Sequence, residues 1–492
     1  MGTVESLRLF LPEVILSASV MAIIFADLLS PRGGSRGGAA IIAVGGALAA
    51  LGASVALAGS APTWLFGRMV ILDPFAVFFK VLLSLSLLAA VIMSIGSHEI
   101  QGRPNAGEYY TLLVASGLGM LLMASAGNLL MAYLSLEFVS LTSYVLTGFL
   151  KHNRRSSEAA LKYLIYGGVA SGAMIYGMSW MYGLTGSLDY GVIATKLAAL
   201  DAAATPALFV GLVLVLVGLG FKVAAVPFHM WVPDVYTGAP LPVTTFLAVG
   251  SKAAGFALLV RFFHFGVGEA GPTAIVADSP LPMLLGLVSA ITMTVGNLAA
   301  LAQDNVKRLL AYSSVSHAGY ALIGVVVFRD AGVHAVLFYL AVYYVMNLGA
   351  FWVMMLVVNA SGREDIGALR GLAWRGGALP AVALAIFLFS LAGLPPFAGF
   401  LAKLEVFKAG IDGGEIPLVV VGALNGVVSL YYYARLVKAM FLVEPTWDDP
   451  PVRFAWSDLG AVAMLSAATL VLFFEYGWLA EHTTAAARLY TG

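Results

Sequence analysis

The sequence predicts an all-α membrane protein with about 14 membrane-spanning helices, since each span needs roughly 20 apolar residues. Of its 492 residues, 61% are hydrophobic and 11% are charged, whereas soluble domains carry about 25% charged residues. Apolar runs follow one another along the whole chain, and short segments with Gly, Pro or charged residues separate them. No separator is long enough to hold a soluble domain, so we expect one membrane domain over residues 1–492.

The predicted spans fall into four groups. Three N-terminal helices lie within residues 1–107, a first repeat covers 108–265, a second repeat covers 281–443, and a last helix covers 456–478. The first apolar run, residues 9–29, is longer than the core of a signal peptide, so we expect it to be retained as a helix. The predicted spans are 7–29, 39–59, 73–95, 108–126, 128–150, 158–182, 207–232, 241–265, 281–302, 307–328, 331–359, 378–408, 416–443 and 456–478.

Lys and Arg are more numerous in the odd-numbered loops between these spans than in the even-numbered loops and the tails. The loop at 30–38, for example, holds Arg32 and Arg36, whereas Arg261 is one of the few basic residues that we assign to an even loop. Cytoplasmic loops carry the excess of basic residues. We therefore expect a multi-pass protein of the bacterial cytoplasmic (inner) membrane with both termini on the non-cytoplasmic side.

Two spans contain prolines close to a lysine. Pro227 follows Lys222 in the seventh span, and Pro395 and Pro396 precede Lys403 in the twelfth. Proline removes a backbone donor, and such a break is tolerated at membrane depth only against protein or a water-filled cavity. The broken helix is the fourth of five in spans 4–8 and again in spans 9–13. Units with an odd number of helices run in opposite directions, which predicts two inverted five-helix repeats.

Three charged residues are predicted to lie deep in the membrane. Lys222 and Lys252 are far from the ends of their spans, and Glu137 lies about halfway along the fifth span. A lysine at the bilayer centre costs roughly 2.5–3.5 kcal/mol, so it suggests a function. A buried carboxylate offsets the desolvation of a buried ammonium, so we expect Glu137 to pair with Lys222 or Lys252. A static ion pair that only fixes helix register is the structural alternative.

His317 lies in the middle of the tenth span, among several serines. Imidazole titrates closest to physiological pH and can relay protons, although a histidine bonded to a serine or a carbonyl is also a good core residue. Five further basic residues lie nearer to the ends of their spans, where a long side chain can reach the interface or pair with an acid. They are Lys80, Lys162, Lys408, Arg435 and Lys438.

Composition also argues against several functions. The net charge is zero and no basic cluster stands out, so we expect no positively charged surface that could bind nucleic acid. The chain has no cysteine, which excludes disulfides and iron–sulfur ligation by thiolates of this chain. Its seven histidines include no HExxH-type pair, so we expect no metal or haem site. Any redox chemistry is expected on other subunits.

Four separated segments carry a family resemblance. LSLEFVSLTSYVL, GFKVAAVPFHMWVPDVYTGAP, DNVKRLLAYSSVSHAGY and LAGLPPFAGFLAKLEVF resemble the antiporter-like proton-channel subunits of respiratory complex I. That superfamily includes subunits of Mrp-type cation/proton antiporters and of membrane-bound hydrogenases. The resemblance extends over about residues 70–440. The short C-terminus, Lys403 and the LPEVIL segment around Glu13 are most similar to the N-type branch.

The resemblance implies a role for each deep charge. Glu137 and Lys222 would form the charged pair of the first half-channel, Lys252 would bridge toward the centre, and Lys403 would exchange protons with the far side. His317 falls where the family often has a titratable relay group. The implied partners are lipids and the other complex I membrane subunits, including sister antiporter-like subunits. NADH, FMN, iron–sulfur clusters and quinone would be bound by partner subunits.

The predicted function is therefore proton translocation by a non-redox subunit of NADH-quinone oxidoreductase. Protons would enter from the cytoplasmic side at Lys222, pass Lys252 and leave on the other side after Lys403. Two alternatives stay open. The chain could belong to an Mrp-type Na⁺/H⁺ antiporter or a membrane-bound hydrogenase, or it could be a structural scaffold whose buried charges only hold helices together.

Overall fold

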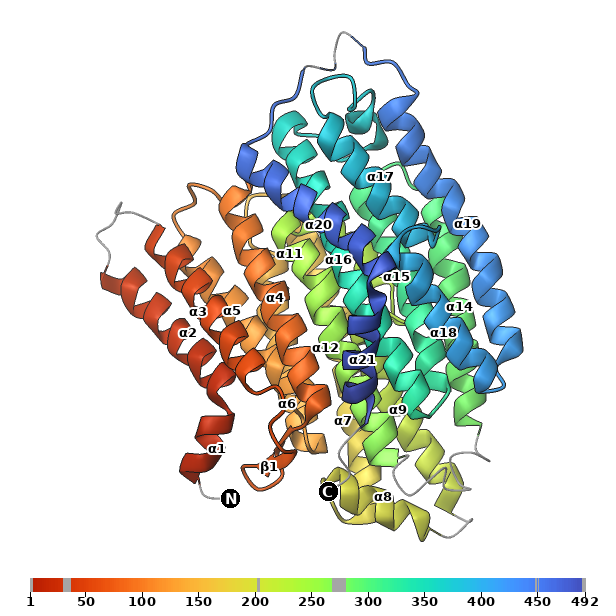
Figure 1. Cartoon of the computed structure of the whole chain (residues 1–492). Coiled ribbons are helices and arrows are strands. Elements are labelled where there is room, and N and C mark those ends of the chain that lie inside the picture. The colour runs from red at the N-terminus through yellow and green to blue at the C-terminus, as the bar shows by residue number, and fades with distance from the viewer. Residues whose placement is uncertain are drawn as a thin grey trace.

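The computed structural model describes residues 3–29, 37–200, 204–267, 280–446, 449 and 451–488. In these residues the chain forms a bundle of long helices that stand side by side, with one two-stranded antiparallel sheet (Figure 1). Twelve helices of the described part are long and apolar enough to cross a membrane. The predicted fold class is thus confirmed. Arg32 and Arg36, which entered the prediction of orientation, lie outside the described residues.

Each predicted span coincides with one helix or with two or more consecutive helices. The sixth span is a single helix that is long enough to cross, but its many Gly, Tyr and Ser residues make it less apolar than the others. The twelfth span is divided into two short helices. The elements are α1 (Thr3–Leu9), α2 (Leu11–Leu29), α3 (Gly37–Ala56), β1 (Thr63–Leu65), β2 (Val70–Leu72), α4 (Pro74–Gly96), α5 (Ala106–Ala124), α6 (Leu129–Thr147), α7 (Arg154–Thr185), α8 (Tyr190–Ala198), α9 (Thr205–Val223), α10 (Trp231–Gly238), α11 (Leu241–Phe246), the π-helix η2 (Leu247–Ser251), α12 (Lys252–Arg261), the π-helix η3 (Phe262–Val267), α14 (Leu281–Leu301), α15 (Val306–Val326), α16 (Asp330–Ser361), the 3₁₀ helix η4 (Ile366–Leu369), α17 (Ala378–Ala392), α18 (Ala398–Asp412), α19 (Ile416–Phe441), α20 (Trp456–Phe474) and α21 (Tyr476–Ala487).

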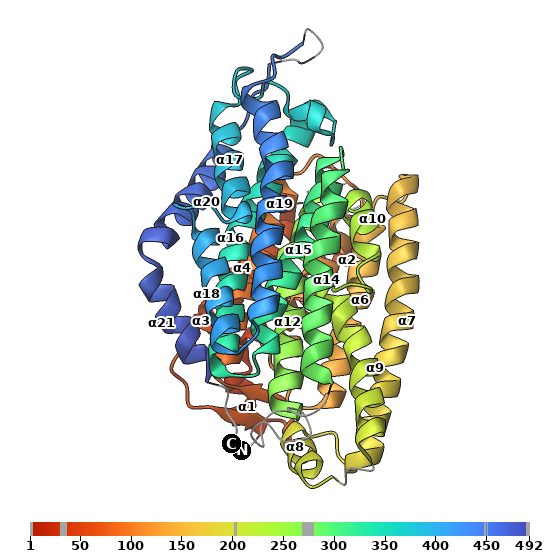
Figure 2. The same ribbon diagram turned by 90° about the vertical axis from the view of Figure 1, so that its right-hand side faces the viewer.

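The first and last helices lie at the same end of the bundle. Figures 1 and 2 show α1 at this end, which α21 also approaches, together with the sheet β1–β2 and the short helix α8. Below, this end is called the termini end. The predicted number of spans is even, and an even number of crossings returns the chain to the side where it started. The positions of the first and last helices agree with this expectation.

Burial divides the bundle into a centre and a shell. In the most apolar stretch of each helix, all residues are buried for the segment 241–264 and 94% are buried for α15. The corresponding shares are 28% for α2 and 22% for α20. The outer helices therefore present apolar side chains to the outside of the bundle, and the central helices are enclosed almost entirely by protein. Lys252 and His317 belong to these central helices, so their polar groups can be satisfied only by other protein groups or by internal water.

Candidate functional site

Both helix breaks occur where the prolines predict them. α9 ends at Val223, Ala224 adopts a left-handed conformation with φ 67°, and α10 begins at Trp231. α17 ends at Ala392, Gly393 has φ 86°, and α18 begins at Ala398. The last carbonyls of a helix have no partner within it. Each break therefore leaves backbone acceptors inside the bundle, and side chains of the candidate site satisfy two of them.

The lysines and the histidine of the predicted row are buried, whereas Glu137 is half-buried. The exposed fractions are 2% for Lys222, 3% for Lys252, 2% for His317 and 6% for Lys403. None of these side chains points into lipid. Snorkelling to the membrane surface is therefore excluded for the three lysines, and each must be satisfied inside the protein.

At the first break, the ammonium of Lys222 lies beside α6. Lys222 Nζ donates a hydrogen bond to Ser140 Oγ at 3.5 Å. Glu137 lies one turn before Ser140 on the same helix and is within electrostatic range of Lys222. The expected direct ion pair of Glu137 with Lys222 or Lys252 is absent, because Lys222 reaches Ser140 and Lys252 turns toward α15. Glu137 Oε1 is buried and has no hydrogen-bond partner among the described residues.

Lys252 is the first residue of α12, directly after the π-helix η2. Its Nζ donates hydrogen bonds to both the backbone carbonyl and the hydroxyl of Ser314 in α15. Tyr343 donates from its hydroxyl to the same Ser314 Oγ at 2.9 Å. The lysine is thus connected through one serine to a tyrosine of α16.

His317 joins three helices at the centre of the bundle. Its Nδ1 lies 2.6 Å from the hydroxyl of Tyr339, and its Nε2 lies 3.3 Å from the hydroxyl of Tyr433. Tyr433 in turn lies 2.5 Å from Ser313 Oγ. Both Lys252 and Lys403 are within electrostatic range of the imidazole. The predicted relay residue therefore lies between the second and third lysines, with hydroxyl groups on both ring nitrogens.

Lys403 donates a hydrogen bond to a free backbone carbonyl at the second helix break. Its Nζ donates to the backbone carbonyl of Ala392, the last residue of α17, at 2.8 Å. The ammonium also lies 4.5 Å from the ring centre of Tyr320, a geometry in which a cation is attracted to the aromatic face. A lysine beside a proline pair is explained by this contact, because the break provides the carbonyl that the buried ammonium needs.

An ionic cluster and an aromatic stack lie next to the first break. Asp234 of α10 accepts from Lys162 at 2.7 Å and from Arg308 at 2.6 Å. The neighbouring Tyr163 stacks on Trp231, with ring centres 4.3 Å apart and planes at 9°. Asp234 and Arg308 also line a cavity of about 280 Å³. Lys162 was predicted to snorkel or to pair with an acid, and it pairs.

Sequence reasoning missed the tyrosines that connect the charges. Tyr339 and Tyr343 are four residues apart on α16 and therefore share one face. That spacing was visible in the predicted span at 331–359. However, an apolar span with tyrosines on one face is also typical of a helix at the lipid interface, so the pattern alone does not indicate a relay.

One basic residue was placed wrongly. Arg261 was assigned to an even loop, but it is 1% exposed and ends α12 inside the bundle. It forms two hydrogen bonds with Asp73, at 2.7 and 3.0 Å, and its Nε donates to the carbonyl of Ala124. The carboxylate and the carbonyl together compensate the cost of burying the guanidinium.

The remaining basic residues of the spans behave as predicted for structural groups. Lys80 forms a buried ion pair with Glu13 at 2.8 Å. Arg435 pairs with Asp304 at 2.8 Å near the end of its helix. Lys408 and Lys438 are exposed.

Comparisons with known proteins place this geometry in context. Residues 126–429 match a transmembrane family described as NADH:quinone oxidoreductase/Mrp antiporter. The chain is 45% identical over 510 residues to NADH-quinone oxidoreductase subunit N of Anaeromyxobacter sp. (strain Fw109-5), covering 98% of this chain and 97% of that protein.

The fold is also similar to that of solved structures. A chain of respiratory complex I from Thermus thermophilus with bound aureothin has a TM-score of 0.81 and 33% identity, with 96% of this chain and 99% of that chain covered. A chain of the Mrp complex from Dietzia sp. DQ12-45-1b has a TM-score of 0.83 and 24% identity, with 99% and 97% covered. The second likeness shows the fold alone.

Proposed function

Because the chain belongs to the NADH:quinone oxidoreductase/Mrp antiporter family, we propose that it is a proton-translocating membrane subunit of NADH-quinone oxidoreductase. The proposal is supported by identity over nearly the full length of a subunit N. It is also supported by the three buried lysines and the buried histidine, none of which forms an ion pair with a carboxylate in the described part of the chain.

The observation that carries the proposal is the lateral row of buried titratable groups. Lys222, Lys252, His317 and Lys403 belong to α9, α12, α15 and α18, and these helices stand side by side across the bundle (Figure 2). Serine hydroxyls accept from Lys222 and from Lys252, Tyr343 donates to the second of these serines, and the hydroxyl of Tyr433 contacts His317. A proton that moves along this row travels parallel to the membrane plane, and it needs an access route to water at each end.

In the proposed mechanism, a proton reaches Lys222 from the cytoplasmic side and passes Lys252 and His317 to Lys403. Glu137 acts on the first lysine, since a nearby carboxylate changes how firmly an ammonium holds its proton. A movement of α6 that brings Glu137 nearer to Lys222, or takes it away, would load or release the proton. Both termini would face the side on which protons leave.

Moving one charge against 100 mV costs about 2.3 kcal/mol. The chain has no cysteine that could hold an iron–sulfur cluster, so we propose that the energy comes from redox subunits through contacts within the membrane. The partners would be sister antiporter-like subunits and the other membrane subunits of the complex. NADH, FMN, iron–sulfur clusters and quinone would be bound elsewhere in the assembly.

Substitution of the first charged pair tests the proposal. We expect Lys222→Ala and Glu137→Gln to lower NADH-driven proton pumping by roughly tenfold or more, because each removes a group that holds or directs the proton. The measurement is acidification of inside-out membrane vesicles together with NADH oxidation and the amount of assembled complex. Lys438→Ala, at an exposed lysine of α19, is the control. Near-normal coupled turnover in both test variants would contradict the proposed function.

A subunit of an Mrp-type Na⁺/H⁺ antiporter is the second candidate, favoured by the similarity of fold. Sequence identity is higher to the oxidoreductase subunit than to the Mrp chain, at 45% against 24%. The polypeptides that purify with the chain distinguish the two, because only the oxidoreductase brings NADH-binding and quinone-binding subunits. A pure scaffold would instead lose assembly, with coupling unchanged in the complexes that remain.

A further inference from the structure

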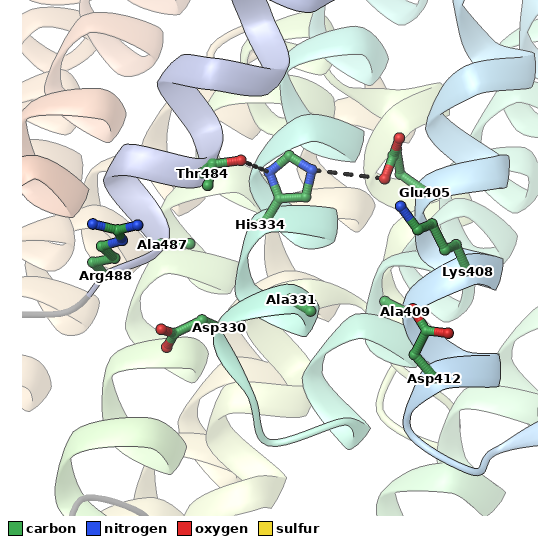
Figure 3. Close-up of a pocket in the computed structure, with 10 residues that line it drawn as sticks. All are labelled: Asp330, Ala331, His334, Glu405, Lys408, Ala409, Asp412, Thr484, Ala487 and Arg488. Atoms are coloured by element: carbon green, nitrogen blue, oxygen red, sulfur yellow. Dashed lines mark hydrogen bonds and ion pairs between the residues drawn. The ribbon is translucent and has the colours of Figure 1, made fainter.

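A second group of titratable residues lines a cavity at the termini end, apart from the row of lysines. The cavity has a volume of about 430 Å³ and lies between α16, α18 and α21 (Figure 3). We call it the exit basin. Its titratable or charged lining residues are Asp330, His334, Glu405, Lys408, Asp412 and Arg488.

His334 and Glu405 form the inner pair of the exit basin. Nε2 of His334 lies 3.7 Å from Oε2 of Glu405, and their side chains are 16% and 22% exposed. The other ring nitrogen, Nδ1, lies 2.9 Å from Thr483 Oγ1 of α21. Imidazole and carboxylate side chains are the groups that most readily exchange protons near neutral pH. The pair is therefore held in place by three helices while it stays in contact with the cavity.

The exit basin reaches well below the surface. Glu405 lies seven residues before the end of α18 at Asp412, which corresponds to about 10 Å along the helix axis. Lys403 is only two residues farther in, or about 3 Å of rise. The inner pair and the last buried lysine thus lie at nearly the same depth on one helix.

They lie on different faces of α18. Lys403 contacts the end of α17 and Tyr320 of α15, whereas Glu405 faces His334 of α16. Toward the termini end, the contact between α15, α18 and α19 is filled by Ile323, Phe407 and Val419, which pack around Gly410 and Gly422. These apolar side chains cannot carry a proton. On the opposite face of α18, in contrast, Glu405, His334 and the other charged lining residues extend from this depth to the termini end.

We propose that the exit basin is where translocated protons pass between the buried row and the aqueous phase at the termini end, with Glu405 and His334 as the receiving pair. The ammonium of Lys403 gives up one proton and becomes a neutral amine, and the carboxylate of Glu405 takes it up through water and becomes a carboxylic acid. Glu405 then loses that proton to His334 or to water in the basin, past Lys408, Asp330, Asp412 and Arg488. This step rests on the proposed function.

Accessibility is tested without any assay of activity. The chain has no cysteine, so single cysteines can be introduced at Ala331 and Thr484, which are exposed and line the basin, and at Ala402, which is buried on α18. We expect a membrane-impermeant thiol reagent to label Ala331→Cys and Thr484→Cys in the assembled complex roughly tenfold faster than Ala402→Cys, as a water-filled pocket requires. Labelling should come from the face that exposes a C-terminal tag. Labelling at the rate of Ala402→Cys, or from the opposite face, would overturn the proposal.

Pumping is the second test, in inside-out vesicles that contain the assembled complex. We expect the rate of NADH-driven pumping to be roughly tenfold lower in the double variant Glu405→Gln, His334→Asn. Glu481→Gln, an exposed carboxylate of α21, should pump normally. Normal pumping by the double variant together with a defect in Lys403→Ala refutes the exit basin alone. Normal pumping by both refutes the proposed function as well.

Discussion

Gly393 is the residue that allows Lys403 to occupy the second helix break. Its φ of 86° lies in the region that residues with a side chain rarely adopt. A Cβ at this position would also lie 2.7 Å from Cδ of Lys403. Glycine therefore meets two separate requirements, one of the backbone and one of the neighbouring lysine.

This double requirement leads to a prediction for Gly393→Ala. We expect the methyl group to displace the ammonium from the carbonyl of Ala392, so that pumping falls roughly tenfold while the complex still assembles. Gly414→Ala is a matched control, because Gly414 has φ 88° but no heavy atom within 4 Å of the added Cβ. It should cost about 1–2 kcal/mol of backbone energy and leave pumping unchanged. Equal effects of the two substitutions, measured as pumping per assembled complex, would contradict the role given to Gly393.

At the scale of elements, the two halves of the first broken helix are tied together by Trp231. Its Nε1 donates to the carbonyl of Phe221 near the end of α9 at 3.1 Å, while its ring stacks on Tyr163 of α7. The stack lies beside the Asp234 cluster, and Phe221 directly precedes Lys222. The aromatic contact thus connects the ionic cluster to the first lysine.

Removal of this hydrogen bond is expected to disturb Lys222. Trp231→Phe keeps an aromatic ring for Tyr163 but leaves the Phe221 carbonyl without its donor, a cost of about 1–3 kcal/mol. We expect a lower rate of pumping and a lower melting temperature of the purified complex. Trp374→Phe is the control, because Trp374 makes the same kind of bond, to the carbonyl of Phe441 at 3.0 Å, at an exposed position. A similar loss in both variants would mean that the bond has no special role at the break.

The elements differ in how far the sequence predicts them. The breaks at Pro227 and at Pro395 and Pro396 were predicted, because a missing backbone donor is a local property of the chain. The π-helix before Lys252 was not, since no local signal distinguishes it from an α-helical turn. The placement of Arg261 was wrong for a related reason: the groups that compensate burial of the guanidinium, Asp73 and the carbonyl of Ala124, are distant in the sequence.

At the scale of the whole molecule, the complete candidate site could not be predicted from the sequence, because this requires knowing which helix faces contact one another. Glu137, Lys222, Lys252 and Lys403 were found from the sequence, since a charge in an apolar span is visible without a structure. The connecting hydroxyls of Tyr339, Tyr343 and Tyr433 were not, because tyrosine is common in membrane helices. The predicted ion pair of Glu137 is not formed, because Lys222 bonds instead to Ser140, one turn away on α6. The arrangement of two inverted repeats stays a prediction.

The buried pair of Glu13 and Lys80 offers a test of how the N-terminal helices are held. It links α2 to α4 at 2.8 Å, both side chains are 0% exposed, and apart from this ion pair neither charged end has a hydrogen-bond partner in the described part of the chain. Removing one partner of a buried pair leaves the other charge uncompensated and costs about 3–5 kcal/mol, whereas replacing both by apolar groups is often neutral. A pair that only joins helices should follow this rule.

We therefore expect Lys80→Met and Glu13→Leu alone to reduce the amount of assembled complex in the membrane, and the double variant to restore both assembly and pumping. A blue-native gel and the vesicle assay measure the two quantities. If the double variant assembles but does not pump, the pair takes part in proton movement and the row of titratable groups extends into the N-terminal helices. That outcome would contradict the structural role, because an apolar pair of similar volume preserves the packing of α2 on α4 while it removes every group that can hold a proton.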